Sequence, residues 1–133
     1  EKLSKELKTN IKFKNYVSYE DSKKIIETAD LGLVSLIPNM YKYAYPSKTM
    51  VYLEQGIPIL ALIEKKSDLA RKIIQNSIGF VHSKKNNKSL AEFIIKLSKE
   101  SGWKINFKKA CLETFKSDFS DEVILRKWEK IIN

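Results

Sequence analysis

The sequence predicts an α/β fold, in which a Rossmann-like parallel sheet carries helices on both faces and is followed by C-terminal helices. Short apolar runs of strand length alternate with segments of helical periodicity, in the order β-α-β-α-β-α-β. Continuous apolar runs are typical of parallel strands that are covered on both faces. The last third of the chain has helical patterns only, which predicts three helices after the final strand.

The first part of the chain predicts two strands and a helix between them. Residues 1–8 have the pattern of the tail of a helix, and residues 11–13 that of a short strand. Ser18 predicts the N-cap of a helix over residues 19–29, and residues 31–37 form a second apolar run of strand length. The helical positions expected to face inward are Ile25, Ile26 and Ala29.

The most informative stretch, residues 45–61, predicts a loop, a short helix, a glycine stop and a strand. Pro46 suits the first turn of a helix, and the Ser47 hydroxyl can cap the amides of that turn. Gly56 suits the left-handed residue just past a helix end. The apolar run over residues 58–63 predicts a buried strand.

Four helices and one short strand complete the prediction. Ser67 caps a helix that ends near residue 76, and Gly102 separates two later helices. The last helix begins after Ser120, and its apolar stripe either packs on the core or reaches another domain. The strand is expected at 79–81, the two later helices at 89–101 and 105–116, and the stripe comprises Leu125, Trp128 and Ile132.

The 133 residues suit one domain with a hydrophobic core. Because the chain begins without Met and with the end of a helix, we expect residues 1–133 to be cut from a longer protein. No leader and no membrane-spanning run occurs, which favours the cytoplasm. Cys111 is the only cysteine, and its helical spacing from Phe107 and Phe115 predicts a packed core residue.

The formal charge of +9 leaves three interpretations open. A composition rich in Lys, Ile and Asn can leave a solvated basic surface, a basic face can attract acidic lipid head groups, and it can bind nucleic acid. The cations are scattered and mostly Lys, and no motif of a nucleic-acid module occurs. We therefore expect no nucleic-acid partner, and we retain an acidic membrane surface, at the inner face of the membrane, as a partner.

The residues indicate a binding site more than a catalytic one. Neither G-x-G-x-x-G nor a P-loop motif occurs, so no cofactor is expected. His82 is the only histidine, which argues against a His-based triad and a metal cluster. Ser35 and Ser47 lack the context of an activated nucleophile. We therefore predict no catalytic residue and no metal site.

An anion site is predicted at the carboxyl edge of the sheet, where open parallel sheets bind their ligands. The helix start after Pro46 offers amides with a partial positive charge, and Lys48 adds a full charge for a phosphate. Tyr41, Tyr43 and Tyr45 come just before and can stack on a sugar or a base. Alternatively, one or two tyrosines anchor the loop on the core, and Lys48 is a solvated lysine.

Five segments match the pattern of one known family in order and spacing. They are NIKFKNYV (10–17), ADLGLV (29–34), PSKTMVYLEQGIPIL (46–60), NSIGFV (76–81) and FS (119–120). Together they resemble the C-terminal domain of the group 1 glycosyltransferases, the retaining enzymes of the GT-B fold. The resemblance covers nearly the whole chain, and it implies that residues 1–133 are a single partial domain that lacks the family's first strand and its N-terminal domain.

The resemblance implies a site for a nucleotide-diphosphate sugar, in two parts. The sugar and diphosphate would lie against Tyr43, Tyr45, Pro46, Ser47, Lys48 and Thr49, and the base and ribose against Asn15, Tyr16, Val17 and Val51. Val51 departs from the family, which often has a ribose-binding Glu there. Asn15 replaces the glycine of a turn, and Asn tolerates a positive φ.

The main hypothesis is that the chain is the donor-binding half of a retaining glycosyltransferase in surface polysaccharide or glycolipid synthesis. The donor would be a UDP-sugar, the N-terminal domain would close over it, and the fragment alone would be inactive. The alternative is a non-catalytic α/β module for assembly or for docking to an acidic membrane.

Overall fold

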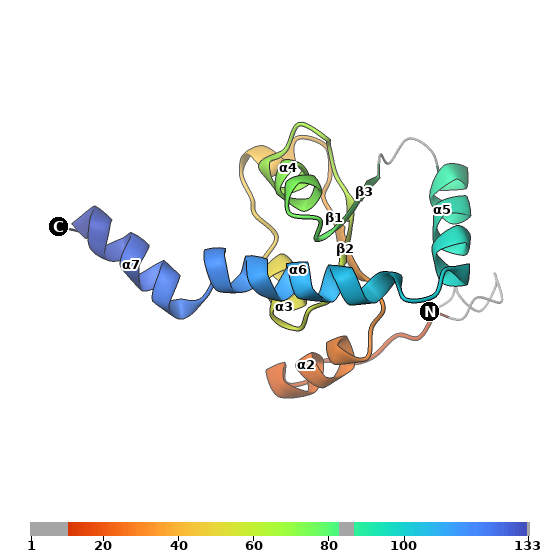
Figure 1. The fold of residues 1–133 in the computed structure, drawn as a ribbon, viewed down its shortest axis with the longest axis horizontal. Helices are drawn as coiled ribbons and strands as arrows, with labels where there is room; N and C mark the ends of the chain where they lie inside the picture. The colour runs from red at the N-terminus through yellow and green to blue at the C-terminus, as the bar shows by residue number, and fades with distance from the viewer. Residues whose placement is uncertain (1–10, 83–86, 133) are drawn as a thin grey trace.

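The computed structural model, which describes residues 11–82 and 87–132, is an α/β protein with a parallel sheet, flanking helices and further helices at the C-terminal end (Figure 1). The predicted fold class is confirmed. The expected helix end over residues 1–8 lies outside the described residues. The elements are α2 (Tyr19–Glu27), β1 (Gly32–Ser35), the 3₁₀ turn η1 (Met40–Lys42), α3 (Lys48–Glu54), β2 (Ile59–Leu62), α4 (Asp68–Gln75), β3 (Gly79–His82), α5 (Asn87–Lys99), α6 (Trp103–Asp118) and α7 (Asp121–Ile132).

The sheet of the described residues has three strands in the order β1-β2-β3. Ile59 of β2 pairs with Gly32 of β1 on one side and with Gly79 of β3 on the other, so both outer strands have a glycine beside Ile59. A Cβ on Gly32 would lie 2.5 Å from the Tyr52 ring, which shows that α3 packs directly on β1 there. Because all three strands are parallel, their carboxyl ends meet at one edge.

The α3–β2 segment folds as its sequence predicts. Gly56 has φ 68°, and its N–H donates to the Leu53 carbonyl at 3.0 Å while the Ile57 N–H donates to the Tyr52 carbonyl at 2.8 Å. These bonds satisfy carbonyls at the end of α3. The chain then enters β2, in which Ile59 is fully buried.

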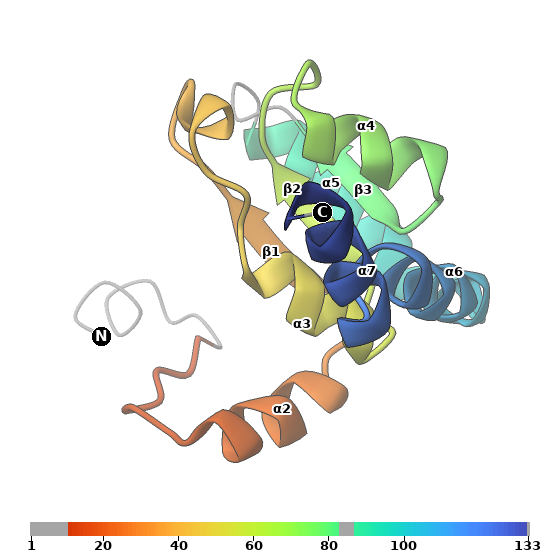
Figure 2. The same ribbon diagram turned by 90° about the vertical axis from the view of Figure 1, so that its left-hand side faces the viewer.

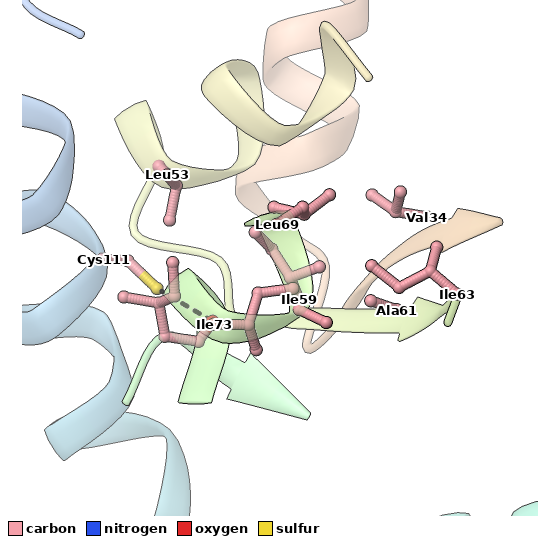
Figure 3. Packing of buried hydrophobic residues seen from close by; sticks show 10 residues of the cluster. Val34, Leu53, Ile59, Ala61, Ile63, Leu69, Ile73 and Cys111 are labelled. Atoms are coloured by element: carbon pink, nitrogen blue, oxygen red, sulfur yellow. Dashed lines mark hydrogen bonds between the residues drawn. The ribbon is translucent and has the colours of Figure 1, made fainter. Parts of the chain in front are cut away.

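The hydrophobic core lies between one face of the sheet and the helices α3, α4 and α6 (Figure 3). Ser67 caps α4, since its hydroxyl accepts from the Ala70 N–H at 3.1 Å. Cys111 of α6 is fully buried, as predicted, and its thiol lies 3.7 Å from the Ile78 carbonyl oxygen. The core side chains include Val34, Leu53, Ile59, Ala61, Ile63, Leu69, Ile73 and Cys111.

An aromatic cluster covers β3 on its other side. The ring of Phe80 lies 4.9 Å from Phe93 of α5 and 4.9 Å from Phe107 of α6, measured between centroids. Trp103 joins the cluster at 6.1 Å from Phe80. Since Phe80 alternates with Val81 of the core cluster, helices lie against both faces of the sheet at this strand.

The predicted strand over residues 11–13 is wrong. Residues 11–18 have no regular structure, and Ile11 and Phe13 are 57% and 59% exposed. An apolar run of three residues has strand propensity, but it forms a strand only where a neighbouring strand pairs with it. The described chain does not provide that pairing.

The helices at the two ends of the described chain, α2 and α7, contribute no buried residue (Figure 2). Ile25 was expected to face inward, but it is exposed, while Ile26 and Ala29 are half-buried. An ion pair of 2.7 Å between Lys23 and Glu54 ties α2 to α3. The stripe of α7 is exposed as well, so it does not pack on the described core; its members are Leu125, Trp128 and Ile132.

Candidate functional site

The loops that follow β1 and β2 enclose a cavity of about 240 Å³ at the carboxyl edge of the sheet. We call it the tyrosine hollow. It opens between the loop after β1 and the start of α4. Its lining residues are Leu36, Tyr41, Lys42, Tyr43, Ala44, Tyr45, Pro46, Ser67, Asp68 and Leu69.

Two contacts hold the loop after β1 against the loop after β2. Asn39 has φ 65°, a conformation that Asn tolerates, and its N–H donates to the Glu64 carboxylate at 2.8 Å. The Lys66 ammonium lies 5.6 Å from the centroid of the Tyr41 ring. Tyr41 is therefore tied to the scaffold, and the loop has a defined position over the sheet.

The two other tyrosines of the loop have different environments. Tyr45, which is 41% exposed, packs on Phe119 at 6.0 Å between ring centroids, and partial burial, with the nearby charge of Asp118, raises the pKa of Tyr45 to about 12. Tyr43 is 84% exposed. Tyr45 thus anchors the loop on the core, whereas Tyr43 presents its ring to solvent at the hollow.

The start of α3 differs from the prediction at Ser47. The Ser47 backbone is already helical, with φ −58° and ψ −31°, and its hydroxyl makes no cap bond within the described chain. The N–H groups of Thr49 and Met50 instead donate to the carbonyls of Pro46 and Ser47, each at 3.0 Å. The predicted side-chain cap is therefore wrong, because the chain enters the helix through tight turns that already satisfy these amides.

Lys48 and Val51 lie in a second cavity, of about 300 Å³, between α2 and α3. We call it the α2–α3 groove. Lys48 is exposed and makes no ion pair with the described residues. The groove is lined by Tyr19, Ser22, Lys23, Ile26, Lys48, Val51 and Tyr52.

The structure thus divides the predicted site between two cavities on either side of α3. Tyr43, Tyr45 and Pro46 line the tyrosine hollow, and Lys48 and Val51 line the α2–α3 groove. The other predicted site residues line neither cavity; they are Asn15, Tyr16, Val17, Ser47 and Thr49. The segment Asn15, Tyr16 and Val17 runs without regular structure before α2, with Tyr16 98% exposed, and Thr49 is buried in α3 beside Ser47.

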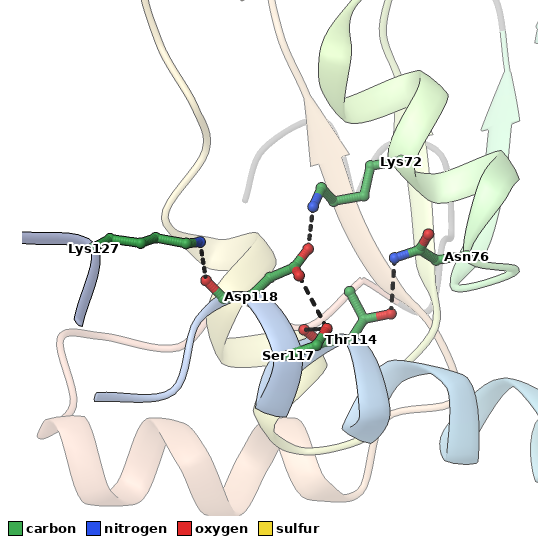
Figure 4. Close-up of polar contacts among 6 residues, drawn as sticks. All are labelled: Lys72, Asn76, Thr114, Ser117, Asp118 and Lys127. Atoms are coloured by element: carbon green, nitrogen blue, oxygen red, sulfur yellow. Dashed lines mark hydrogen bonds and ion pairs between the residues drawn. The ribbon is translucent and has the colours of Figure 1, made fainter. Parts of the chain in front are cut away.

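A polar network beside the tyrosine hollow joins α4 to the end of α6 (Figure 4). Asp118 pairs with Lys72, and its backbone carbonyl accepts from Lys127 of α7 at 3.1 Å. Burial alone would raise the pKa of Asp118, but hydrogen bonds from Lys72 and Ser117, with the charges of Lys72 and Lys127, lower it. Sequence reasoning missed this network, because its two main partners are 46 positions apart and carry no motif.

The described residues that line the two cavities supply hydroxyl groups, aromatic rings and ammonium groups, which can bind a ligand. No set of three His, Cys, Asp or Glu side chains within residues 11–82 and 87–132 is placed to hold a metal ion. Burial raises the pKa of the Cys111 thiol to about 12, so this thiol is not an activated nucleophile. In the described ranges, no helix has the length and apolar character to span a membrane.

Comparisons of the chain with protein-family models, with curated proteins and with solved structures each found no match. The inference of function therefore depends on the residues and their geometry.

Proposed function

We propose that the chain binds a nucleotide-diphosphate sugar, with UDP as the nucleotide, across the start of α3. The tyrosine hollow would take the sugar, and the α2–α3 groove would take the nucleoside. The diphosphate would cross between them at Ser47 and Lys48. The full-length protein would act as a retaining glycosyltransferase in surface polysaccharide or glycolipid synthesis, with an N-terminal domain that closes over the donor.

The observation that carries this proposal is the pair of cavities on either side of α3, which are the tyrosine hollow at the carboxyl edge of the parallel sheet and the groove between α2 and α3. A ligand with two bulky ends and an anionic centre suits that arrangement. Lys48, the first residue of α3, presents an exposed side chain in the α2–α3 groove, and the Tyr43 ring offers a stacking face in the tyrosine hollow. The resemblance of residues 46–60 to a nucleotide-sugar site supports the same assignment.

Calorimetric titration of the full-length protein with UDP and with a UDP-sugar tests the proposal. Removing one charge-assisted contact costs about 1.5–3 kcal/mol, so we expect Lys48→Ala to weaken UDP binding by roughly 10- to 100-fold. Lys99→Ala is the matched control, because Lys99 is exposed on α5 and lines neither cavity. Equal UDP affinity for the wild type and Lys48→Ala would remove Lys48 from the site, and no binding of UDP would overturn the proposal.

The second candidate function is that of a non-catalytic module that docks to an acidic membrane surface. One observation favours it: α7 presents an apolar stripe to solvent in a chain of net charge +9. Trp128 in the middle of that stripe is 58% exposed, and Trp is favoured at membrane interfaces. This candidate would use α7 and would leave both cavities empty.

A further inference from the structure

A further cavity, of about 350 Å³, lies along β3 on the side away from β2. We call it the β3 cleft. All four residues of β3 line it, and because successive side chains of a strand point to opposite faces, the cleft includes the edge between the faces. Figure 1 shows β3 between α4 and α5, and both helices contribute to the cleft. Its lining includes Ile74, Gly79, Phe80, Val81, Phe93 and Phe107.

The direction of the peptide groups of β3 follows from its pairing with β2. The Ile78 carbonyl accepts from the Ile59 N–H at 3.0 Å, and the register of the two strands directs the N–H and C=O of Phe80 toward β2. The C=O and N–H of one planar trans peptide point in opposite directions. The N–H and C=O groups of Gly79 and Val81 therefore point away from β2, into the cleft.

These groups place a hydrogen-bond acceptor beside a donor. The Gly79 carbonyl and the Val81 N–H flank Phe80 on the same side of the strand. Within residues 11–82 and 87–132, β3 pairs with β2 alone, so the sheet leaves both groups without a partner. Both residues are half-buried, and half-buried polar groups of this kind favour a ligand that matches them.

Apolar walls flank this pair of groups on both faces of the sheet. Ile74 of α4 lies on the face of the hydrophobic core, and Phe93 of α5 and Phe107 of α6 lie on the other face. The rings of Phe93 and Phe107 are each held at 4.9 Å from that of Phe80, measured between centroids. The space between the walls suits a flat ring that turns its edge to the strand and its faces to the apolar side chains.

We propose that the β3 cleft binds adenine, as the free base or as part of a nucleotide. The amino group of the base would donate to the Gly79 carbonyl, and the neighbouring ring nitrogen would accept from the Val81 N–H. Small-molecule sites are mostly apolar, with a few placed polar groups and volumes from about 300 Å³ upward, so the cleft suits a two-ring base. A polypeptide strand at this edge would need room for side chains on both faces, where Ile74 and Phe93 already stand.

This site is separate from the proposed function. The β3 cleft is bounded by β3, α4, α5 and α6, whereas the tyrosine hollow lies between the loop after β1 and the start of α4, and the α2–α3 groove lies beside α3. A chain that binds no UDP can still bind adenine, and a chain that binds UDP at α3 can still lack the adenine site.

Calorimetric titration of the native gene product with adenine, and separately with ATP, tests the proposal. We expect at least one of them to bind and to move the backbone amide resonances of Gly79 and Val81, and the tighter of the two distinguishes a base site from a nucleotide site. The matched control ligand is 6-dimethylaminopurine, which has the same rings and no donor. It should bind about 10-fold more weakly, because it leaves the Gly79 carbonyl unpaired.

Three results would overturn the proposal. They are no binding of adenine or ATP, resonance changes that do not include β3, and equal affinity for adenine and 6-dimethylaminopurine.

Two variants locate the site independently. Val81→Pro removes the outward N–H and keeps the bonds between β3 and β2, because proline is tolerated on edge strands. We expect it to weaken the tighter ligand about 10-fold. Should Val81→Pro fail to fold, Ile74→Ala removes one wall at a position that is 60% exposed, and it should weaken binding severalfold. Ile95→Ala is the matched control, since Ile95 is 55% exposed and lies outside the cleft. Affinity that Ile74→Ala leaves equal to that of Ile95→Ala would contradict the proposal.

Discussion

At the scale of single residues, the most unusual group is the hydroxyl of Thr49. Its side chain is fully buried in α3, and its oxygen has no hydrogen-bond partner among the described residues. A buried polar group without a partner costs about 1–3 kcal/mol. Thr114 is similarly buried, but its hydroxyl accepts from the Asn76 side chain at 3.2 Å. The two threonines can therefore be compared directly, as a buried hydroxyl without a partner and a buried hydroxyl with one.

We predict that Thr49→Val leaves the free energy of unfolding unchanged or raises it by about 1 kcal/mol, because valine keeps the shape and removes the unpaired hydroxyl. Thr114→Val should lower it by about 1 kcal/mol, because it leaves the Asn76 amide without its acceptor. Urea unfolding with equal slopes for all three proteins gives the comparison. If Thr49→Val were the more destabilising change, the Thr49 hydroxyl would have a partner, and the site at the start of α3 would need revision.

At the scale of elements, sequence reasoning succeeded where one short segment determines the structure. Pro46, Gly56 and the apolar run after Pro58 act through local backbone preferences, and the helix, the left-handed stop and β2 all form as predicted. The strand over residues 11–13 failed, since pairing depends on a neighbour that propensity does not reveal. The Ser47 cap failed because tight turns at Pro46 had already satisfied the amides it would have served.

The candidate site residues stay a prediction, and the sequence did not indicate that they would line separate cavities. The tyrosines and Lys48 are close in sequence, but the tyrosines belong to the loop before α3, whereas Lys48 belongs to α3 and lines the groove that α3 forms with α2. The direction in which a helical side chain points depends on the packing of α2 against α3, which a single sequence does not specify. The same limit explains why the pairing of Lys72 with Asp118 was missed.

The junction between α4 and α6 leads to a prediction on pH. Since the pKa of Asp118 is lowered in the folded protein, its ion pair stabilises fully above the unfolded value of about 3.9. That stabilisation is lost as the pH falls through the lowered folded pKa. We expect the urea concentration at the unfolding midpoint of the wild type to decrease as the pH drops below about 4. Asp118→Asn should be less stable than the wild type at pH 6, and its midpoint should depend less on pH in this acid range.

Urea unfolding between pH 2.5 and pH 6 gives the measurement, with pH values chosen around the unfolded pKa of roughly 3.9. Glu92→Gln is the control, because Glu92 is an exposed carboxylate of α5 in no ion pair with the described residues. The urea midpoint of Glu92→Gln should depend on pH in the same way as that of the wild type. An acid dependence in Asp118→Asn as steep as that of the wild type would show that other carboxylates dominate acid unfolding.

At the scale of the whole molecule, the core is small and the helices at the ends of the described chain lie outside it. The buried cluster joins β1 and β2 to α3, α4 and α6, whereas α2 and α7 add no buried residue. Regions with few buried contacts open most easily and are available for partners. The uncovered apolar stripe along α7 is consistent with that role.

The last prediction concerns α7 and the charge of the chain. If α7 docks to an acidic membrane, the protein should float with vesicles that contain phosphatidylglycerol, and not with phosphatidylcholine vesicles. Each cation near such a surface contributes about 1 kcal/mol, so added salt should weaken the binding. Trp128→Ser should reduce it severalfold, because the apolar stripe would lose its largest side chain. Ile95→Ser is the matched control, since Ile95 is 55% exposed on α5. Flotation that salt and Trp128→Ser leave unchanged would exclude α7 as the membrane anchor, and absence of flotation would leave its stripe for contacts with protein.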